Sequence, residues 1–427
     1  MQIDATGGSR SQCFPVGAHN AADQEQWRNL RHLRAVAAVA EHGTVINAAL
    51  ALHLSQPAVT RSIHALEQAL RTTLFHRNSR GMLPTPAGNV VVRRTARAFS
   101  HLRRARTDAL AAMPRGADDS CSEDRFVRAL TYRQLEVFLG LASAGTETQA
   151  ARLLGLSQPG VNRIIREFEA SLGIRLFERT SQGVLPTPAG TALLRGTRLA
   201  FEELRLVCCE LSAGQSESQR KLVIGALPLT NALFVPQSIE RMLHAHADIQ
   251  ITVIDGTYDT LLQKLRHAEI DALVGALRDP LPFTDLVQEH LFDDALSVAV
   301  RLQHPLTQAG PLSLDNLIQH DWVAPLPGTP AHAAFERAFQ AIDRAPPRRQ
   351  IQANSMDLIR ALLLGSDRLA LVSRRLAQLD LQAGTLAVLP VEVRHTERAI
   401  GVVRRRHQEL SPVLESFLNT LRNRDYH

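Results

Sequence analysis

Residues 149–190 read QAARLLGLSQPGVNRIIREFEASLGIRLFERTSQGVLPTPAG, and this stretch decides the fold of the N-terminal half. Residues 47–88, NAALALHLSQPAVTRSIHALEQALRTTLFHRNSRGMLPTPAG, repeat its frame 102 positions earlier. Extended outward, residues 28–105 (copy one) align with residues 130–207 (copy two) without a gap, with 34 identities over 78 positions. Identities this dense at one fixed offset indicate duplication of a folded unit.

Both copies predict the same series of elements. An opening helix, over residues 30–41 and 132–143, ends at a glycine, and a short second helix carries a pair of alanines that allow close packing. After a tight turn, Ser55 and Ser157 are predicted N-caps of a third helix, with Pro57 and Pro159 in its first turn. A polar hairpin and a long helix, over residues 86–113 and 188–212, complete each copy.

The third helix of each copy has one apolar and one polar face. The residues predicted to be buried are Val59, Ile63, Leu66 and Leu70 in copy one, and Val161, Ile165, Phe168 and Leu172 in copy two. The polar face carries Gln56, Thr60, Arg61 and His64 in copy one, and Gln158, Asn162, Arg163 and Arg166 in copy two. A solvated polar face is common to amphipathic helices, but glutamine, asparagine and arginine behind a capped turn favour a helix that reads the DNA major groove. Arginines of the hairpin, Arg77, Arg80 and Arg179, suit phosphate contacts.

Composition and motifs exclude several other classes of protein. No apolar run approaches the roughly 20 residues that span a bilayer, and the N-terminus has no signal-peptide pattern, so we expect a cytoplasmic protein without membrane contact. The four cysteines have no metal-binding spacing, and no nucleophile elbow, phosphate loop or H-E-x-x-H motif is present. We therefore expect no enzyme, no metal and no cofactor.

The C-terminal half, from Lys221, alternates strands and helices. The strands KLVIGAL, IQITVID, DALVGAL, DWVAPL, RRQIQA and RLALVS are mostly followed by helical segments. This βαβ series predicts a largely parallel sheet, in which ligands bind beyond the carboxyl ends of the strands, near helix N-termini.

The sequence resembles the LysR-type transcriptional regulators. Copy two carries the family pattern of a double alanine, SQP, Leu-Gly, LF-x-R and T-x-AG nearly throughout. Copy one departs at Leu70–Arg71, where the family has Leu-Gly, and lacks a basic residue in its second helix. The second copy is itself a departure, because a family member ordinarily has one such unit.

The resemblance implies the fold and the site residues. We expect two winged helix-turn-helix domains and an α/β effector domain like a type 2 periplasmic binding protein, with two subdomains over residues 221–297 with 395–423, and 298–394. The residues named on the third helices and hairpins, with Pro57 and Pro159, would contact DNA. The expected effector contacts are Leu229, Thr230, Thr257, Gly328, Thr329, Asn354 and Ser355, and the hydroxyls among them are equally well explained as helix caps.

These expectations give a domain map. It comprises a disordered tail (1–27), a first winged helix-turn-helix (28–85), its linker helix (86–113), a polar connector (114–129), a second winged helix-turn-helix (130–187), its linker helix (188–213) and an effector domain (221–424). Expected partners are promoter or operator DNA, a small-molecule metabolite and further copies of the chain as a dimer or tetramer, with RNA polymerase as a further candidate. The alternative function is a cytosolic small-molecule-binding protein with degenerate helix-turn-helix units.

The two copies differ in charge, and their linker helices can pair in two ways. Residues 28–106 hold thirteen arginines against two glutamates, whereas residues 130–208 hold nine arginines against seven glutamates. We therefore expect copy one to supply non-specific phosphate affinity and copy two to read sequence. The apolar stripe of the second linker helix, at Leu193, Leu199, Leu204, Val207 and Leu211, needs a partner helix. That partner is either the first linker helix of the same chain or the linker helix of another chain.

Overall fold

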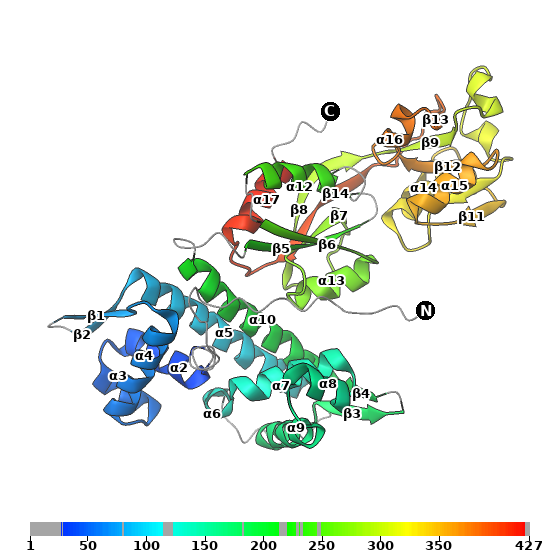
Figure 1. Cartoon of the computed structure of the whole chain (residues 1–427). Helices are drawn as coiled ribbons and strands as arrows, with labels where there is room; N and C mark the ends of the chain where they lie inside the picture. Colours follow the sequence, from blue (N-terminus) through cyan, green and yellow to red (C-terminus); the bar gives the residue numbers. More distant parts are fainter. Residues whose placement is uncertain are drawn as a thin grey trace. The chain divides into compact units, whose positions relative to one another are not determined.

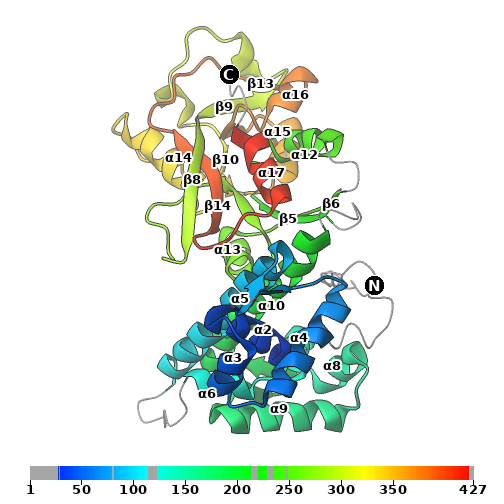
Figure 2. The same cartoon turned by 90° about the vertical axis from the view of Figure 1, so that its left-hand side faces the viewer.

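The structure, a computed structural model, describes residues 27, 29–78, 81–113, 123–181, 183–212, 220–227, 230, 234–245 and 249–422. They belong to two compact units, residues 1–219 and 220–427, and each unit is described by itself. Both copies of the repeat lie in the N-terminal unit (Figures 1 and 2). Within the described residues, no helix is both long and apolar enough to cross a membrane.

The two copies fold alike, as the repeat predicts. Copy one contains α2 (Leu30–His42), α3 (Val45–Leu52), α4 (Gln56–Leu70), β1 (Phe75–Asn78), β2 (Gly81–Pro84) and α5 (Pro86–Ala111). Copy two contains α7 (Tyr132–Ala144), α8 (Glu147–Leu154), α9 (Gln158–Leu172), β3 (Phe177–Thr180), β4 (Gly183–Pro186) and α10 (Pro188–Ser212). The predicted helix starts and hairpins are confirmed, and the burial pattern holds except at Leu172, which is only partly buried.

Two conserved features of the repeat fix the hairpin and the start of the long helix. Gly81 has φ 132°, and a Cβ atom there would lie 2.4 Å from the carbonyl oxygen of Gly43, which accepts a hydrogen bond from Met82. Thr85 caps α5 by accepting from the backbone of Gly88 and donating to the carbonyl of Thr73. The same contacts recur in copy two, so the hairpin is held against the opening helix in both copies.

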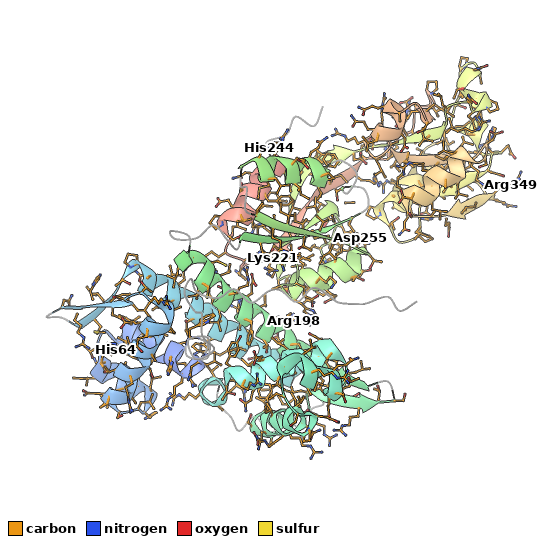
Figure 3. All side chains as sticks on the ribbon, viewed as in Figure 1. His64, Arg198, Lys221, His244, Asp255 and Arg349 are labelled. Carbon is orange, nitrogen blue, oxygen red and sulfur yellow. The ribbon has the colours of Figure 1, made fainter. Side chains whose placement is uncertain are left out.

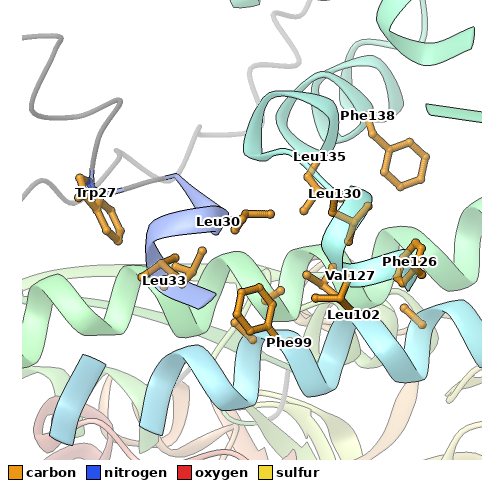
Figure 4. Close-up of a cluster of buried hydrophobic side chains, with 14 of the residues drawn as sticks. Trp27, Leu30, Leu33, Phe99, Leu102, Phe126, Val127, Leu130, Leu135 and Phe138 are labelled. Carbon is orange, nitrogen blue, oxygen red and sulfur yellow. The ribbon is translucent and has the colours of Figure 1, made fainter. Parts of the chain in front are cut away.

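One apolar core runs through both copies (Figure 4). It includes Phe99 and Leu102 of α5 and Leu135 and Phe138 of α7. It also includes Trp27, which is only 3% exposed, so the tail predicted over residues 1–27 is wrong at its last residue, while residues 1–26 lie outside the described part.

The connector is also more ordered than its polar sequence predicts. Its last seven residues form α6 (Glu123–Ala129), and residues 114–122 are outside the described part. Phe126 and Val127 of α6 are buried, and the carbonyl of Val127 accepts a hydrogen bond of 2.9 Å from Arg34 of α2. Two apolar side chains in the short polar segment are enough to dock it on copy one.

The long helices α5 and α10 pack against each other within one chain (Figure 1). Arg93, near the start of α5, pairs with Glu210, near the end of α10, and Asp108, near the end of α5, pairs with Arg195 of α10. The helices are therefore antiparallel. Of the two pairings that the sequence allows, the structure contains the one within the chain.

The C-terminal unit has two five-stranded sheets. The first has the order β6-β5-β7-β14-β8, formed by β5 (Arg220–Ala226), β6 (Ile249–Asp255), β7 (Ala272–Ala276), β8 (Leu286–Asp294) and β14 (Arg398–Arg405). The second has the order β11-β10-β12-β9-β13, formed by β9 (Leu296–Arg301), β10 (Trp322–Ala324), β11 (Gln350–Gln352), β12 (Leu369–Ser373) and β13 (Leu386–Val388). The α-helices in the described part of this unit are α12 (Phe234–Ala245), α13 (Tyr258–Arg266), α14 (Pro330–Gln340), α15 (Met356–Leu364), α16 (Gln378–Gln382) and α17 (Pro412–Arg422).

The prediction of a largely parallel sheet is wrong, because both sheets are mixed. β5 pairs in parallel with β6 and β7, but β14 runs antiparallel to β7 and β8. The second sheet repeats this arrangement around β9. The chain passes from the first sheet to the second between β8 and β9, and it returns to the first sheet between β13 and β14. The strands that follow these two crossings, β9 and β14, are the ones that run antiparallel to their neighbours.

Candidate nucleic-acid interface

The polar face of α9 lies where the sequence predicts it. Gln158, Pro159, Arg163 and Arg166 are exposed, and Asn162 is half-buried. Ser157 caps the helix by accepting from the backbone of Gly160 at 3.2 Å, and the buried face is formed by Val161, Ile165 and Phe168. The capped N-terminus of α9 therefore presents its amide and guanidinium groups to solvent.

A residue that the sequence reasoning missed, Glu147, connects these side chains. Glu147 is the first residue of α8, and its carboxylate accepts hydrogen bonds from Asn162 Nδ2 at 2.8 Å and from Gln158 Nε2 at 3.3 Å. Its Oε1 also accepts from Arg179 Nη2, on hairpin strand β3, at 2.8 Å. One carboxylate thus joins the third helix to the hairpin, and the sequence signal was an acid at the N-terminus of the second helix.

The charge on Glu147 is maintained by these contacts. Burial by itself raises the pKa of the carboxyl, but hydrogen bonds from Asn162 and Gln158 and the charge of Arg179 hold the pKa below its usual range. The group is therefore ionised at neutral pH. Carboxylates in general repel phosphate groups and can accept a hydrogen bond from the amino group of cytosine.

Copy one has the same frame with a different surface. Gln56, Pro57, Arg61 and His64 of α4 are exposed, and Thr60 is half-buried. The guanidinium of Arg61 reaches back to the carbonyl of Pro57 at 3.3 Å, and the His64 ring, 65% exposed, lies 3.6 Å from Glu67 (Figure 3). At the position of Glu147 copy one has Val45, so the counterpart of this carboxylate is missing from copy one.

Each hairpin carries an exposed arginine on its first strand. Arg77 on β1 is exposed, as is Arg179 on β3, whereas Arg80 lies outside the described residues. Each hairpin also has an exposed leucine on its second strand, Leu83 on β2 and Leu185 on β4, at 57% and 58% exposed. The two hairpins have the form of wings, and the guanidinium of Arg179 is paired with Glu147.

The predicted effector contacts lie at the ends of several strands of the C-terminal unit, and most are helix caps. Thr257, Thr329 and Ser355 accept hydrogen bonds from backbone amides in the first turns of α13, α14 and α15. Gly328 and Asn354 precede two of these caps and are exposed. The predicted residue Leu229 lies outside the described residues, and the fully buried Thr230 directs its hydroxyl to the carbonyls of Leu227 and Val274.

A buried ion pair fixes the crossing between the two sheets. Asp294, the last residue of β8, is 2% exposed and binds the guanidinium of Arg398, the first residue of β14. The same carboxylate accepts a hydrogen bond of 2.6 Å from Ser373 Oγ, at the end of β12. The sequence reasoning missed all three, because a polar residue at a strand end shows no partner until the fold places one beside it.

Comparison with known proteins agrees with both halves of this structure. Residues 30–89 and 132–191 each match the family described as "Bacterial regulatory helix-turn-helix protein, lysR family", and residues 215–425 match "LysR substrate binding domain". The chain belongs to the LysR family. It is a DNA-binding transcriptional regulator with a duplicated helix-turn-helix unit and a small-molecule-binding domain.

Among relatives of this LysR-family regulator, the HTH-type transcriptional regulator GalR of Pseudomonas putida is 32% identical over 394 residues, 92% of this chain and 96% of that protein. PcaQ of Agrobacterium fabrum is 27% identical over 293 residues, 69% of this chain and 94% of that protein. Full-length OxyR of Pseudomonas aeruginosa has the same fold, with a TM-score of 0.56 at 20% identity, over 69% of this chain and 95% of that one. The alignment with GalR is long enough to include both copies.

Proposed function

We propose that this LysR-family regulator reads operator DNA with the exposed faces of α4 and α9 and contacts phosphates with both wings. The proposed contacts are Gln56, Pro57, Thr60, Arg61, His64, Arg77 and Arg80 in copy one, and Gln158, Pro159, Asn162, Arg163, Arg166 and Arg179 in copy two. The observation that supports this is the hydrogen bonding of α9 and β3 side chains to one carboxylate, Glu147, which aligns helix and wing on one surface.

A gel-shift titration of the full chain on DNA from upstream of its own gene tests the proposal. Arg163→Ala with Arg166→Ala removes two exposed guanidinium groups from α9, and we expect operator affinity to fall at least tenfold, because each good base contact contributes about 1–3 kcal/mol of discrimination. Arg349→Ala, an exposed arginine of the C-terminal unit, is the matched control (Figure 3). DNA reading by α9 is contradicted if the double variant and the Arg349→Ala control lose operator affinity equally. It is also contradicted if the unaltered chain shows no salt-sensitive DNA binding.

For the C-terminal unit we propose that an anionic or hydroxylated metabolite binds at the carboxyl ends of the parallel strands. The proposed contacts are Thr257, Gly328, Thr329, Asn354 and Ser355, with Leu229 and Thr230 at the end of β5. Free backbone amides of helix N-termini attract anions, which supports this choice. Because the Thr230 hydroxyl is directed at the backbone carbonyls of Leu227 and Val274, it would shape the site and not bind the ligand directly.

A thermal-shift screen of small carboxylates and phosphates tests the effector site. The compound that stabilises the full chain should lose most of its effect in Asn354→Ala, whose side chain is exposed. Asp343→Ala, a surface residue in the turn after α14, is the control. A ligand whose stabilisation is unchanged by Asn354→Ala and Ser355→Ala binds elsewhere.

We also propose that the regulator acts in the cytoplasm as a dimer or tetramer and has no enzymatic activity. DNA and metabolites are both present in that compartment, and the relatives are named as transcriptional regulators. RNA polymerase is a candidate partner on promoter DNA.

A further inference from the structure

We propose that α5 and α10 are complementary to each other and not to themselves, so that one chain forms a complete DNA reader for an operator with two non-identical half-sites. The inference rests on the proposed reading of DNA by α4 and α9. The inference specifies the DNA that α4 and α9 recognise, which is a duplex with two different half-sites.

The helix pair has an approximately two-fold arrangement of contacts. Arg93 and Arg195 occupy equivalent positions of the repeat, as do Asp108 and Glu210. Arg93 pairs with Glu210, and Arg195 pairs with Asp108, so each helix makes the same contact with the other. α5 and α10 therefore relate to each other as the linker helices of two identical subunits would.

The symmetry is broken at several equivalent positions, and the largest difference is between Arg94 and Gly196. The Arg94 side chain is 2% exposed; its Nη1 donates to Glu203 Oε2 at 2.7 Å and its Nε donates to Glu210 Oε1 at 2.6 Å. Glu203 is 9% exposed and also has Arg97 at 3.8 Å and His101 at 3.9 Å. The arginine of one helix thus neutralises buried acid of the other.

At the equivalent site, the close approach of the helices replaces the ion pair. A Cβ atom on Gly196 would lie 2.2 Å from Cβ of Ala105 and 2.7 Å from the carbonyl oxygen of His101. Glycine is therefore required on α10, opposite a small residue on α5. The same position of the repeat is therefore an arginine, Arg94, in copy one and a glycine, Gly196, in copy two.

Neither helix could pair equally well with a second copy of itself. In a pair of two α10 helices, Glu203 would face Gly196 and lose its guanidinium partner, and Val207 would take the place of Ala105 against Gly196. In a pair of two α5 helices, Arg94 would face His101 in place of Glu203 and would keep only Asp108, the equivalent of Glu210, as a carboxylate partner. Because a buried charge without its partner is strongly unfavourable, the mixed pair is preferred.

Connectivity favours the mixed pair within one chain. α6 lies on copy one through the hydrogen bond from Arg34 to Val127, and α7 follows three residues after α6. The aromatic ring of Tyr132 on α7 then stacks on Phe201 of α10 with ring centroids 4.6 Å apart. A short tether of this kind gives the second copy a high effective concentration at the first.

The two reading faces share some side chains and differ in others. Gln56 and Arg61 have the same residue types as Gln158 and Arg163, but Thr60 is replaced by Asn162 and His64 by Arg166. Asparagine pairs with adenine and arginine with guanine, whereas threonine contacts several bases. The two half-sites should therefore share the bases that the glutamines and the equivalent arginines Arg61 and Arg163 read. They should differ at the bases that the other two pairs of side chains read.

Selection of random duplex DNA with the full chain tests this inference. The selected sequence is divided into its two half-sites, and binding is compared between the composite fragment and the two palindromes made from either half. We expect the composite to bind at least tenfold more tightly than either palindrome. Equal or tighter binding to a palindrome overturns the inference, whereas absence of any sequence-specific binding means that the proposed function itself has failed.

A charge exchange tests whether the pair forms within the chain. Arg94→Glu and Glu203→Arg are made singly and together, and affinity for the composite fragment is measured. We expect each single variant to lose at least tenfold. The double variant should regain part of that affinity, because it restores the ion pair between positions 94 and 203 but places the new acid beside Glu210. A mixture of the two single variants should regain none. Recovery in the mixture places the pairing between chains, and absence of recovery in the double variant contradicts the complementarity; both results overturn the inference.

Discussion

Asn162 of α9 donates a hydrogen bond of 2.8 Å from its Nδ2 to the carboxylate of Glu147 on α8. The side chain best suited to read adenine is therefore oriented by an acid before any DNA is present. Copy one has Val45 at the equivalent position, so only copy two has this constraint. The two helix-turn-helix units share a backbone frame but differ in how their reading side chains are held.

Replacing Glu147 with glutamine should therefore exchange selectivity for affinity. Glu147→Gln removes a negative charge from the DNA-facing surface, so binding to non-specific duplex should strengthen several-fold. Loss of the fixed orientation of Asn162 should lower the preference for operator over competitor DNA by about tenfold. Competition gel-shift measures both, with Glu136→Gln on α7 as the control. Unchanged preference would show that Glu147 does not position the reading side chains.

The buried Glu203 makes the stability of the N-terminal unit depend on pH. Burial by itself raises its pKa, but the nearby His101 ring, the hydrogen bond from Arg94 and the charges of Arg94 and Arg97 hold the pKa below its ordinary value of 4.5. Because the pKa is lower in the folded state, the stabilisation is present above about pH 4.5 and is lost as pH falls through the folded-state pKa.

Urea unfolding checks this dependence. Trp27 reports on the N-terminal unit in a Trp322→Phe background, since these are the two tryptophans of the chain. Glu203→Gln should be less stable at neutral pH and should lose less stability on acidification than the parent does. Glu178→Gln, an exposed residue of β3, should retain the parent's dependence. If Glu203→Gln left the loss of unfolding free energy at acidic pH unchanged, the pH dependence of stability would belong to other groups.

Gly190 is required for the close packing of α10 against the loop before β3. A Cβ atom on Gly190 would lie 2.1 Å from the carbonyl oxygen of Leu176, so Gly190→Ala should reduce the free energy of unfolding by about 1–3 kcal/mol. Gly160→Ala is the matched control, because copy one has Ala58 at that position of its third helix. Its Cβ would meet only Ser157 Oγ, at 3.1 Å, and alanine favours the helix by up to about 1 kcal/mol. Trp27 fluorescence compares the two variants; similar effects from both would contradict the steric argument.

Asp294 should stabilise the crossing between the sheets of the C-terminal unit. Asp294→Ala leaves the guanidinium of Arg398, 8% exposed, without its buried carboxylate and should lower stability by about 3 kcal/mol. Ser373→Ala removes one hydrogen bond and should lower it by about 1 kcal/mol. Trp322 fluorescence in a Trp27→Phe background follows unfolding of this unit. Ser373→Ala should still bind operator DNA in the absence of effector. This result would separate the loss of stability in the C-terminal unit from DNA binding by the N-terminal unit.

The sequence by itself determined the elements and the family. Glycines after the opening helices, the SQP turn and the TPAG motif predict the helices and hairpins of both copies correctly, because each acts through backbone geometry within a few residues. Alternation of apolar segments likewise predicts the strands of the C-terminal unit, but not their direction, since direction depends on which sheet the returning chain joins. The same local reasoning assigned Trp27 to a tail, because one tryptophan among polar residues has no visible partner.

Tertiary structure alone decided which side chains meet. Glu147 and Arg179 are 32 residues apart, Arg94 and Glu203 are 109 apart, and Asp294 and Arg398 are 104 apart. No periodicity links such positions, because each pair is brought together by the packing of whole elements. The repeat predicted two copies of one unit. In the pair formed by their long helices, Arg94 meets Glu203 and Gly196 meets Ala105, although Arg94 and Gly196 are equivalent in the repeat.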